Sequence, residues 1–222
     1  MSTNYGTVLF DLDGTLLDTA PDLNAALSGV LRKRGLPALA VNQIKPAIST
    51  GARGMVRFAL GEAVSTAECE QAAQELVDIY RTDLASRTRL FAGMERVLDE
   101  LEQRRLSWGV VTNKRSDLTD PLLQALNLDT RAACVVSGDS TPYMKPHPAP
   151  LLEAAKRLRQ APERCVYIGD AQRDIEAGRR AGMTTLVAAY GYLKDADEPQ
   201  NWGADGIVHQ PLQILSWLDG HE

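Results

Sequence analysis

Five short, continuously apolar segments recur along the chain, and they constrain its fold more than any other feature. They lie at residues 7–10, 108–112, 133–137, 165–169 and 184–189. Each lacks the polar alternation of a half-exposed strand, which is typical of strands that a parallel sheet buries on both faces. Amphipathic helical patterns separate the later segments, at residues 93–106, 118–128, 149–160 and 173–182. Strands that alternate with helices predict an α/β domain with a doubly wound parallel sheet.

Residues 17–88 break this alternation. This region has no strand pattern, and helical periodicity runs through residues 21–36, 52–62 and 66–87. We therefore expect a helical domain at 17–88, inserted into an α/β domain that is made of residues 1–16 and 89–222.

The composition is that of an ordinary globular protein, with 44% hydrophobic and 24% charged residues among 222. A net charge of -5 disfavours nucleic acid as a partner, because the chain has no basic excess. No apolar run approaches the roughly 18 residues of a membrane span, and the N-terminus has no signal-peptide pattern. Cys69, Cys134 and Cys165 lie too far apart for a metal motif. We expect a cytoplasmic monomer or weak homodimer that has free thiols and acts on a small molecule.

Polar residues follow four of the predicted strands. In an open α/β sheet, ligands bind beyond the carboxyl ends of the strands. The residues at these ends, or in the loops after them, are Asp11 and Asp13, Thr112 and Asn113, Lys145, and Asp170 and Asp174. We expect them to converge on one pocket.

This set of side chains predicts phosphoryl transfer. Asp11 and Asp13 place two like charges at the end of a buried strand, which costs stability unless a cation or a reaction needs both. Carboxylates bind Mg²⁺ through oxygen, and a lysine and a hydroxyl can hold the phosphate. A carboxylate can itself be the nucleophile. His147, His209 and His221 follow none of the strands, so no Ser–His pair competes for that role.

Two other interpretations of the aspartate pair are weaker. A calcium-binding EF-hand loop that starts at Asp11 needs glycine at its sixth position, where this chain has Leu16. A purely structural turn would use Asp11 and Asp13 as capping residues. That interpretation leaves Thr112, Lys145 and Asp170 at the other strand ends unexplained.

Four motifs, in this order along the chain, resemble those of the haloacid dehalogenase (HAD) superfamily. They are "DLDGT" at 11–15, Thr112 in "VVTN", Lys145 in "KPHP" and "GDAQRD" at 169–174. The helical segment 17–88 is similar to the C1 cap of that superfamily. The resemblance implies a HAD-like, Rossmann-type core that carries the active site, and a cap that determines substrate specificity.

The resemblance also implies a role for each aspartate. Asp11 would be the nucleophile that accepts the phosphoryl group, and Asp13 the general acid and base. Mg²⁺ would bind a side-chain oxygen of Asp11, the backbone carbonyl of Asp13 and the side chain of Asp170. Asp174 would support the metal site from behind these ligands.

The remaining motif residues would bind the phosphate and set the reaction type. Thr112, the backbone of Asn113 and Lys145 would hold the phosphate oxygens. Apart from the resemblance, Asp139 follows a predicted strand, and we expect it to orient Lys145. Thr15 in "DGT" is similar to the hydrolase form of the motif. The chain would therefore be a Mg²⁺-dependent phosphomonoester hydrolase that works through an aspartyl phosphate.

The predicted cap contains the candidates for substrate recognition. Arg53 lies between Gly51 and Gly54 in a predicted turn before a helix. It either contacts an anionic or hydroxylated substrate or lies on a solvated face. Arg57 is the weaker candidate.

Several segments are similar to the phosphoglycolate phosphatase branch and, within it, to N-acetylmuramic acid 6-phosphate phosphatases. They include "WGVVTNK", "ACVVSGD", "KPHPAPLL" and "AAYGYL". The resemblance favours N-acetylmuramic acid 6-phosphate as the substrate, in cell-wall recycling, with 2-phosphoglycolate as the alternative. Two further alternatives are a sugar phosphomutase on the same scaffold and a receiver-type phosphoacceptor that does not turn over. A receiver would lack the helical insert and the second acidic motif.

Overall fold

The computed structural model describes residues 5–220, and the chain divides into two compact units. The first, here called the core unit, is Met1–Leu17 together with Leu90–Glu222. The second, the helical unit, is Asp18–Arg89. The chain therefore leaves the core unit after its first strand and returns to it more than seventy residues later.

The core unit contains a six-stranded sheet in the order β5-β4-β1-β6-β7-β8. All of its neighbouring strands pair in parallel. The strands are β1 (Thr7–Phe10), β4 (Ser107–Val111), β5 (Cys134–Val136), β6 (Cys165–Gly169), β7 (Thr184–Ala188) and β8 (Gly206–Val208). The predicted α/β class with a parallel sheet is confirmed, and the five predicted strands all form.

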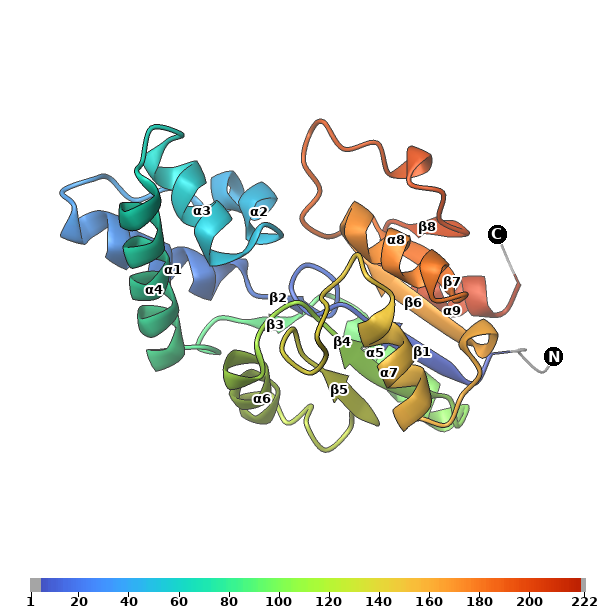
Figure 1. Ribbon diagram of the computed structural model, residues 1–222. Helices are drawn as coiled ribbons and strands as arrows, with labels where there is room; N and C mark the ends of the chain where they lie inside the picture. The colour runs from blue at the N-terminus through green and yellow to red at the C-terminus, as the bar shows by residue number, and fades with distance from the viewer. Residues whose placement is uncertain (1–4, 221–222) are drawn as a thin grey trace. The chain divides into compact units, whose positions relative to one another are not determined.

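Helices cover both faces of this sheet, as Figure 1 shows. They are α5 (Met94–Gln103), α6 (Ser116–Ala125), α7 (Ala149–Arg157), α8 (Gln172–Arg180) and α9 (Gln213–Leu218), with 3₁₀ turns at Pro162–Arg164 and Pro199–Asn201. Helices α7 and α8 pack on one face and share a core cluster with Leu9 and Tyr167. Trp108 points to the opposite face, where its indole N–H donates to Glu102 of α5 at 2.9 Å.

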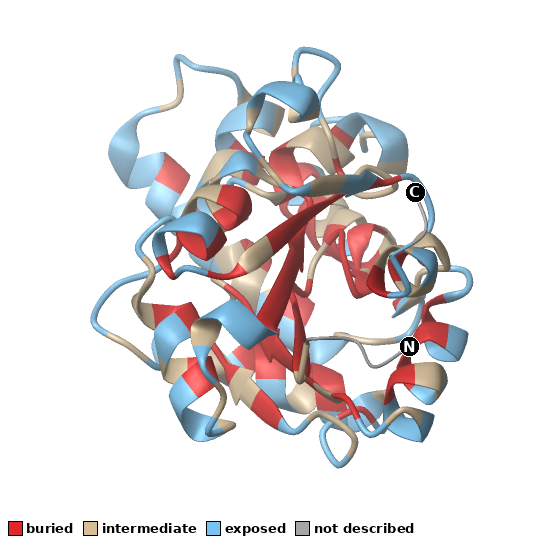
Figure 2. Ribbon diagram, turned by 90° about the vertical axis from the view of Figure 1, so that its right-hand side faces the viewer, coloured by how far each residue is buried: buried red, intermediate tan, exposed pale blue. Residues whose placement is uncertain are grey.

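The strands are apolar because each is buried by helices on both sides. Every residue of β1 and of β6 is buried, and Figure 2 shows buried strands surrounded by helices whose outer faces are exposed. Burial of this kind stabilises the fold by about 25 cal/mol for each Å² of apolar surface. The register places Phe10 beside Ile168 and Val110, so β1, β4 and β6 end at the same edge of the sheet.

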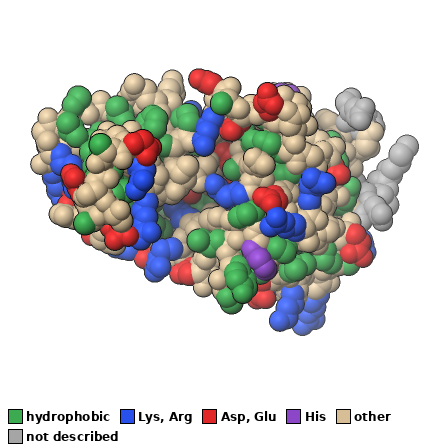
Figure 3. Space-filling view, turned by 45° about the horizontal axis from the view of Figure 1, so that its top comes forward, with side chains coloured by type: hydrophobic (Ala, Val, Ile, Leu, Met, Phe, Trp, Pro, Cys, Tyr) green, Lys and Arg blue, Asp and Glu red, His purple; other side chains and the backbone are tan. Residues whose placement is uncertain are grey.

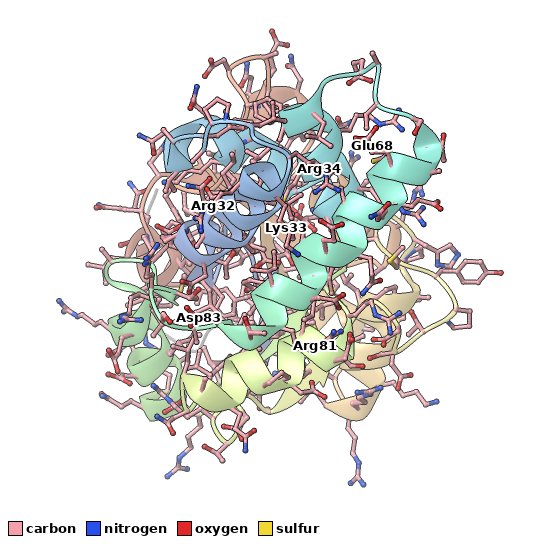
Figure 4. All side chains as sticks on the ribbon, turned by 90° about the vertical axis from the view of Figure 1, so that its left-hand side faces the viewer. Arg32, Lys33, Arg34, Glu68, Arg81 and Asp83 are labelled. Atoms are coloured by element: carbon pink, nitrogen blue, oxygen red, sulfur yellow. The ribbon has the colours of Figure 1, made fainter. Side chains whose placement is uncertain are left out.

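The helical unit consists of α1 (Ala20–Lys33), α2 (Val41–Ile48), α3 (Gly51–Leu60) and α4 (Thr66–Thr82). Helix α4 begins where the sequence offers a cap, since the Ser65 hydroxyl accepts a hydrogen bond from the Glu68 N–H. Arg34, just after α1, forms an ion pair with Glu75 of α4 at 2.8 Å. Figure 4 shows α1 alongside α4, with Arg34 at the end of α1 that lies beside the Glu68 end of α4.

Three short strands differ from the sequence prediction. β2 (Leu17–Asp18) and β3 (Arg89–Leu90) form a separate two-stranded sheet. β2 lies within residues 17–88, for which the sequence predicts no strand, and β3 follows directly after them without having been predicted. β8 at the sheet edge was not predicted either. Two or three residues are too short to show a hydrophobic period, so only the tertiary pairing defines these strands.

The surface mixes charges of both signs. On the face drawn in Figure 3, Lys and Arg side chains lie among Asp and Glu side chains. Among the helices of residues 5–220, none has both the length and the apolar character that a bilayer span requires.

Candidate active site

The site begins at the end of β1, where the strand passes into the "DLDGT" turn. Asp11 continues the β1–β6 ladder, since its N–H donates to the carbonyl of Ile168 at 2.8 Å. Its side chain is buried, and its Oδ1 accepts from the Leu12 N–H at 2.8 Å. Gly14 has a φ of 83°, and a Cβ at this position would overlap Oδ2 of Asp170. The turn therefore requires glycine so that it can lie directly against the aspartate of another motif.

Asp11, Asp170 and Asp174 form a buried carboxylate cluster. One oxygen from each lies within 4.8 Å of the others. Burial, followed by the charges of Asp11 and Asp174, raises the pKa of Asp170 well above its usual range. Oδ1 of Asp170 is buried and accepts no hydrogen bond from any residue that the structure describes. Oxygen ligands, negative charge and an unpartnered carboxylate oxygen together fit a hard divalent cation such as Mg²⁺.

Asp174 is held differently from Asp170. It lies in the first turn of α8, and its Oδ2 accepts from the Ala171 N–H at 3.0 Å. Its Oδ1 pairs with Lys145 Nζ at 2.8 Å. Burial raises the pKa of Asp174, while the ammonium of Lys145 opposes that rise. Because both of its oxygens have donors, Asp174 is suited to a supporting position behind the cation.

Lys145 lies at the centre of the site, and its side chain is fully buried. Its Nζ lies 2.9 Å from Asp11 Oδ1, 2.8 Å from Asp174 Oδ1 and 2.9 Å from the Val111 carbonyl. The hydroxyl of Tyr167 lies 2.6 Å from the same nitrogen. An ammonium has three protons, and four oxygens lie within hydrogen-bond distance of it, so all three of its donors have acceptors in the protein.

Tyr167 and Lys114 are site residues that the sequence analysis missed. Tyr167 lies within β6, where its ring reads as one more core residue, and its hydroxyl is 2.9 Å from the Val111 carbonyl. Lys114 Nζ contacts both carboxylate oxygens of Asp13, at 2.7 and 3.0 Å. The side chain of Lys114 is only 7% exposed. Its place directly after Asn113 is the one feature of the sequence that could have identified it.

Thr112 and Asn113 follow β4, as predicted. The side chain of Asn113 makes two hydrogen bonds to the backbone of Lys145: Nδ2 donates to its carbonyl, and Oδ1 accepts from its N–H, both at 3.0 Å. The Thr112 hydroxyl is buried and accepts from the Lys114 N–H at 3.1 Å. Asn113, in the motif after β4, thus fixes the backbone position of Lys145.

Asp139 and His147 do not belong to this constellation. Asp139 was expected to orient Lys145, but its carboxylate accepts from the N–H and the hydroxyl of Ser116, both at 2.9 Å. It therefore caps the start of α6. His147 is exposed and stacks on Tyr143 at 4.3 Å between ring centroids.

Arg53 belongs to the helical unit. Helix α3 starts at Gly51, so Arg53 lies in its first turn and not in a loop before it, which corrects the prediction. Its side chain is 74% exposed and lies 3.2 Å from Glu70. Arg57 is exposed as well, 3.9 Å from Glu62. Pairs of this kind on the surface contribute little to stability.

Comparison with known proteins agrees with this geometry. The model of the haloacid dehalogenase-like hydrolase family matches residues 8–188. A Pseudomonas putida protein named N-acetylmuramic acid 6-phosphate phosphatase is 43% identical over 96% of this chain and 95% of its own. A Xanthomonas campestris protein named phosphoglycolate phosphatase is also 43% identical, over 93% of each chain. A crystal structure of a predicted phosphoglycolate phosphatase from Haemophilus somnus has a TM-score of 0.86 at 27% identity, over 98% of this chain and 99% of that one. The match over most of the chain, with all four motifs at the strand ends, shows that this protein belongs to the haloacid dehalogenase-like hydrolase family.

Proposed function

We propose that the protein is a Mg²⁺-dependent phosphomonoester hydrolase in which Asp11 is the nucleophile. The observation that supports this most is the buried cluster of Asp11, Asp170 and Asp174, in which the ammonium of Lys145 pairs with Asp11 and Asp174. Three carboxylates with one lysine and the guanidinium of Arg173 leave a net negative charge, which is costly to bury unless a cation completes the cluster. The phosphatases among its relatives agree with this assignment.

The proposed reaction has two steps. In the first, a carboxylate oxygen of Asp11 bonds to phosphorus, and the bond from phosphorus to the alcohol oxygen breaks. Asp13 gives the leaving alcohol a proton. In the second, Asp13 takes a proton from water, the water oxygen bonds to phosphorus, and the bond from phosphorus to Asp11 breaks. Inorganic phosphate leaves and both aspartates return to their first state.

The chain supplies most of what these steps need. Asp11, Asp170 and the carbonyl of Asp13 would hold Mg²⁺, with Asp174 behind them, and the ion would supply positive charge to the phosphoryl oxygens. Thr112 and the backbone N–H of Asn113 would bind the phosphate on the protein side, and the positive charge of Lys145 would attract it.

Lys114 gives Asp13 a fixed starting position. The two contacts from its Nζ hold the carboxylate of Asp13, which is partly exposed, in one orientation beside the site. A general acid must lie within hydrogen-bond reach of the oxygen that it protonates, so such a restraint contributes through geometry.

We propose N-acetylmuramic acid 6-phosphate as the substrate, with the helical unit as the element that selects it. Relatives with that name in Pseudomonas putida and Pseudomonas aeruginosa are 43% and 41% identical to this chain. The alternative is 2-phosphoglycolate, which the 43% identical Xanthomonas relative favours by its name.

The test is phosphate release with Mg²⁺, measured as kcat/KM on both substrates, with Asp11→Asn as the blank. A preference of 100-fold or more for the sugar phosphate, on the order of 3 kcal/mol in transition-state binding, would support the proposal. The reverse preference would assign 2-phosphoglycolate. Equal, weak rates would exclude both substrates, and release that survives in Asp11→Asn would refute the nucleophile.

A further inference from the structure

The segment "AAYGYL" stood out in the sequence, and the reaction described above makes no use of it. Its residues Tyr190, Gly191 and Tyr192, here called the YGY turn, follow the end of β7. The Gly191 N–H donates to the carbonyl of Ala188 at 3.0 Å, which closes the turn on the strand. The turn therefore starts from the same edge of the sheet as the carboxylate cluster.

The YGY turn determines how Asp170 uses its two oxygens. The backbone N–H of Tyr192 donates to Oδ2 of Asp170 at 2.8 Å. Oδ1 of the same carboxylate is the oxygen without a hydrogen-bond partner among the described residues. A single backbone donor thus holds one oxygen and leaves the other available as a ligand.

Two glycines allow this close approach. A Cβ on Gly191 would overlap the carbonyl oxygen of Gly14 and also the Cβ of Asp170. A Cβ on Gly14 would overlap Oδ2 of Asp170 from the other side. Asp170 therefore lies between two backbone segments that only glycine permits, one from the "DLDGT" turn and one from the YGY turn.

Two aromatic side chains anchor the turn. The hydroxyl of Tyr190 donates to the carbonyl of Thr15 at 3.1 Å. Its ring meets Phe91 edge to face at 5.2 Å between centroids, and the ring of Tyr192 lies 6.1 Å from Phe91. The turn is thus fastened to the "DLDGT" turn, whose first residue is Asp11, and cannot shift without disturbing these contacts.

We propose that the YGY turn is a positioning element for the cation, which holds Asp170 with Oδ1 directed to the metal and locks that carboxylate to the turn that carries Asp11. The proposal rests on the proposed function, because it assumes that the carboxylate cluster binds Mg²⁺. Groups that orient a metal ligand in this way commonly change metal affinity by 10- to 100-fold when altered. Neither tyrosine touches the substrate in this scheme, so the effect acts through Asp170.

The experiment measures Mg²⁺ binding by calorimetry without any substrate. It compares the wild type with Gly191→Ala, Tyr190→Phe and the control Tyr143→Phe, whose ring is exposed. We expect the Kd for Mg²⁺ to be about tenfold larger in Gly191→Ala, about threefold larger in Tyr190→Phe and unchanged in the control. Thermal unfolding in a chelator shows which variants are folded before Mg²⁺ is added.

Failure of this inference is distinct from failure of the proposed function. A wild type that does not bind Mg²⁺ would refute the metal site itself. A wild type that binds, with a folded Gly191→Ala that binds equally well, would overturn only the role of the YGY turn. If Gly191→Ala does not fold, Tyr190→Phe decides, because an unchanged Kd in that variant contradicts the proposal.

Discussion

Asp22 in the helical unit and Asp170 in the core unit are both buried, but their carboxylates differ in how they are hydrogen-bonded. In the helical unit, Asp22 accepts hydrogen bonds from the backbone N–H of Arg87 and from the N–H and hydroxyl of Thr88, at 2.8 to 3.2 Å. In the core unit, Asp170 has one backbone donor, two carboxylate neighbours and one oxygen without a hydrogen-bond partner among residues 5–220. Burial alone does not separate the two, since both residues are 2 to 3% exposed.

The two aspartates differ in whether every carboxylate oxygen has a hydrogen-bond donor. A buried carboxylate whose oxygens all have donors needs nothing more and is a structural element. A buried carboxylate with a raised pKa, beside other carboxylates, is stable in its ionised form only when a cation binds. The comparison therefore supports the proposed site in the core unit, on physical grounds that do not depend on the motifs.

The largest expected effect comes from removal of the one ammonium in the cluster. Lys145→Met leaves Asp11 and Asp174 without their shared partner at 2.8 to 2.9 Å. We expect kcat/KM to fall about 10³-fold and the metal-free protein to lose about 3 kcal/mol of unfolding free energy. Enzyme assays and urea unfolding in a chelator measure both. A variant with stability and activity near wild type would show that the cluster does not need the lysine.

Asp22→Asn should separate stability from activity. The amide keeps the shape but replaces an acceptor oxygen with a donor that faces other donors, so we expect a loss of about 2 kcal/mol in unfolding free energy. The kcat/KM of the folded protein should stay within about threefold of wild type. Urea unfolding and steady-state kinetics check these values. A loss of activity like that of the core variants would break the comparison, because Asp22 would then have a role in the reaction.

Arg53→Ala tests whether an exposed residue of the helical unit affects activity without affecting stability. The side chain is exposed and its only described ion pair is with Glu70, so stability should change by less than about 0.5 kcal/mol. If Arg53 contacts the substrate, kcat/KM should fall about tenfold, mostly through KM. Arg81→Ala is the control, since it lies in the same unit in an exposed ion pair with Asp78 and has no proposed role. Equal kinetics for both variants and the wild type would exclude Arg53 as a recognition residue.

The raised pKa of Asp170 predicts a pH dependence with a definite sign. Folded Asp170 holds its proton more tightly than unfolded aspartate, because of burial and then the charges of Asp11 and Asp174. Its contribution to metal-free stability is complete below the ordinary aspartate pKa and is lost as pH rises through the raised value. Mg²⁺ binds the ionised form, so the increase in Tm that it causes should grow with pH, by a few degrees. Unfolding scans with and without a chelator measure this, and an increase independent of pH would contradict the assignment.

The sequence predicted those parts of the site that local rules determine. Three of the five apolar runs end at Asp11, Thr112 and Asp170, and the rule that ligands bind at strand ends predicted that these residues lie together. Lys114 and Tyr167 were missed because each acquires its role from a partner far away in the chain, which no local pattern reveals.

Asp139 was wrongly predicted to orient Lys145, again because local sequence does not show which distant residue a side chain contacts. Asp139 follows a strand and lies near Lys145 in the sequence, yet its carboxylate accepts hydrogen bonds from Ser116 and caps the start of α6. Among the described strands, β2, β3 and β8 form by tertiary pairing alone. Local pattern thus gave the residue types of the site, while the contacts between motifs required the three-dimensional structure.

The most direct test of the central claim is to trap the phosphoryl group on Asp11. The enzyme is mixed with Mg²⁺ and a phosphomonoester substrate and quenched with acid during turnover. Borohydride then reduces any acyl phosphate to the alcohol, and peptide mass spectrometry locates the change. The mechanism predicts reduction at Asp11 alone, in the wild type but not in Asp11→Asn. Rapid phosphate release with no reduced residue at Asp11, or with reduction at another carboxylate, would contradict it.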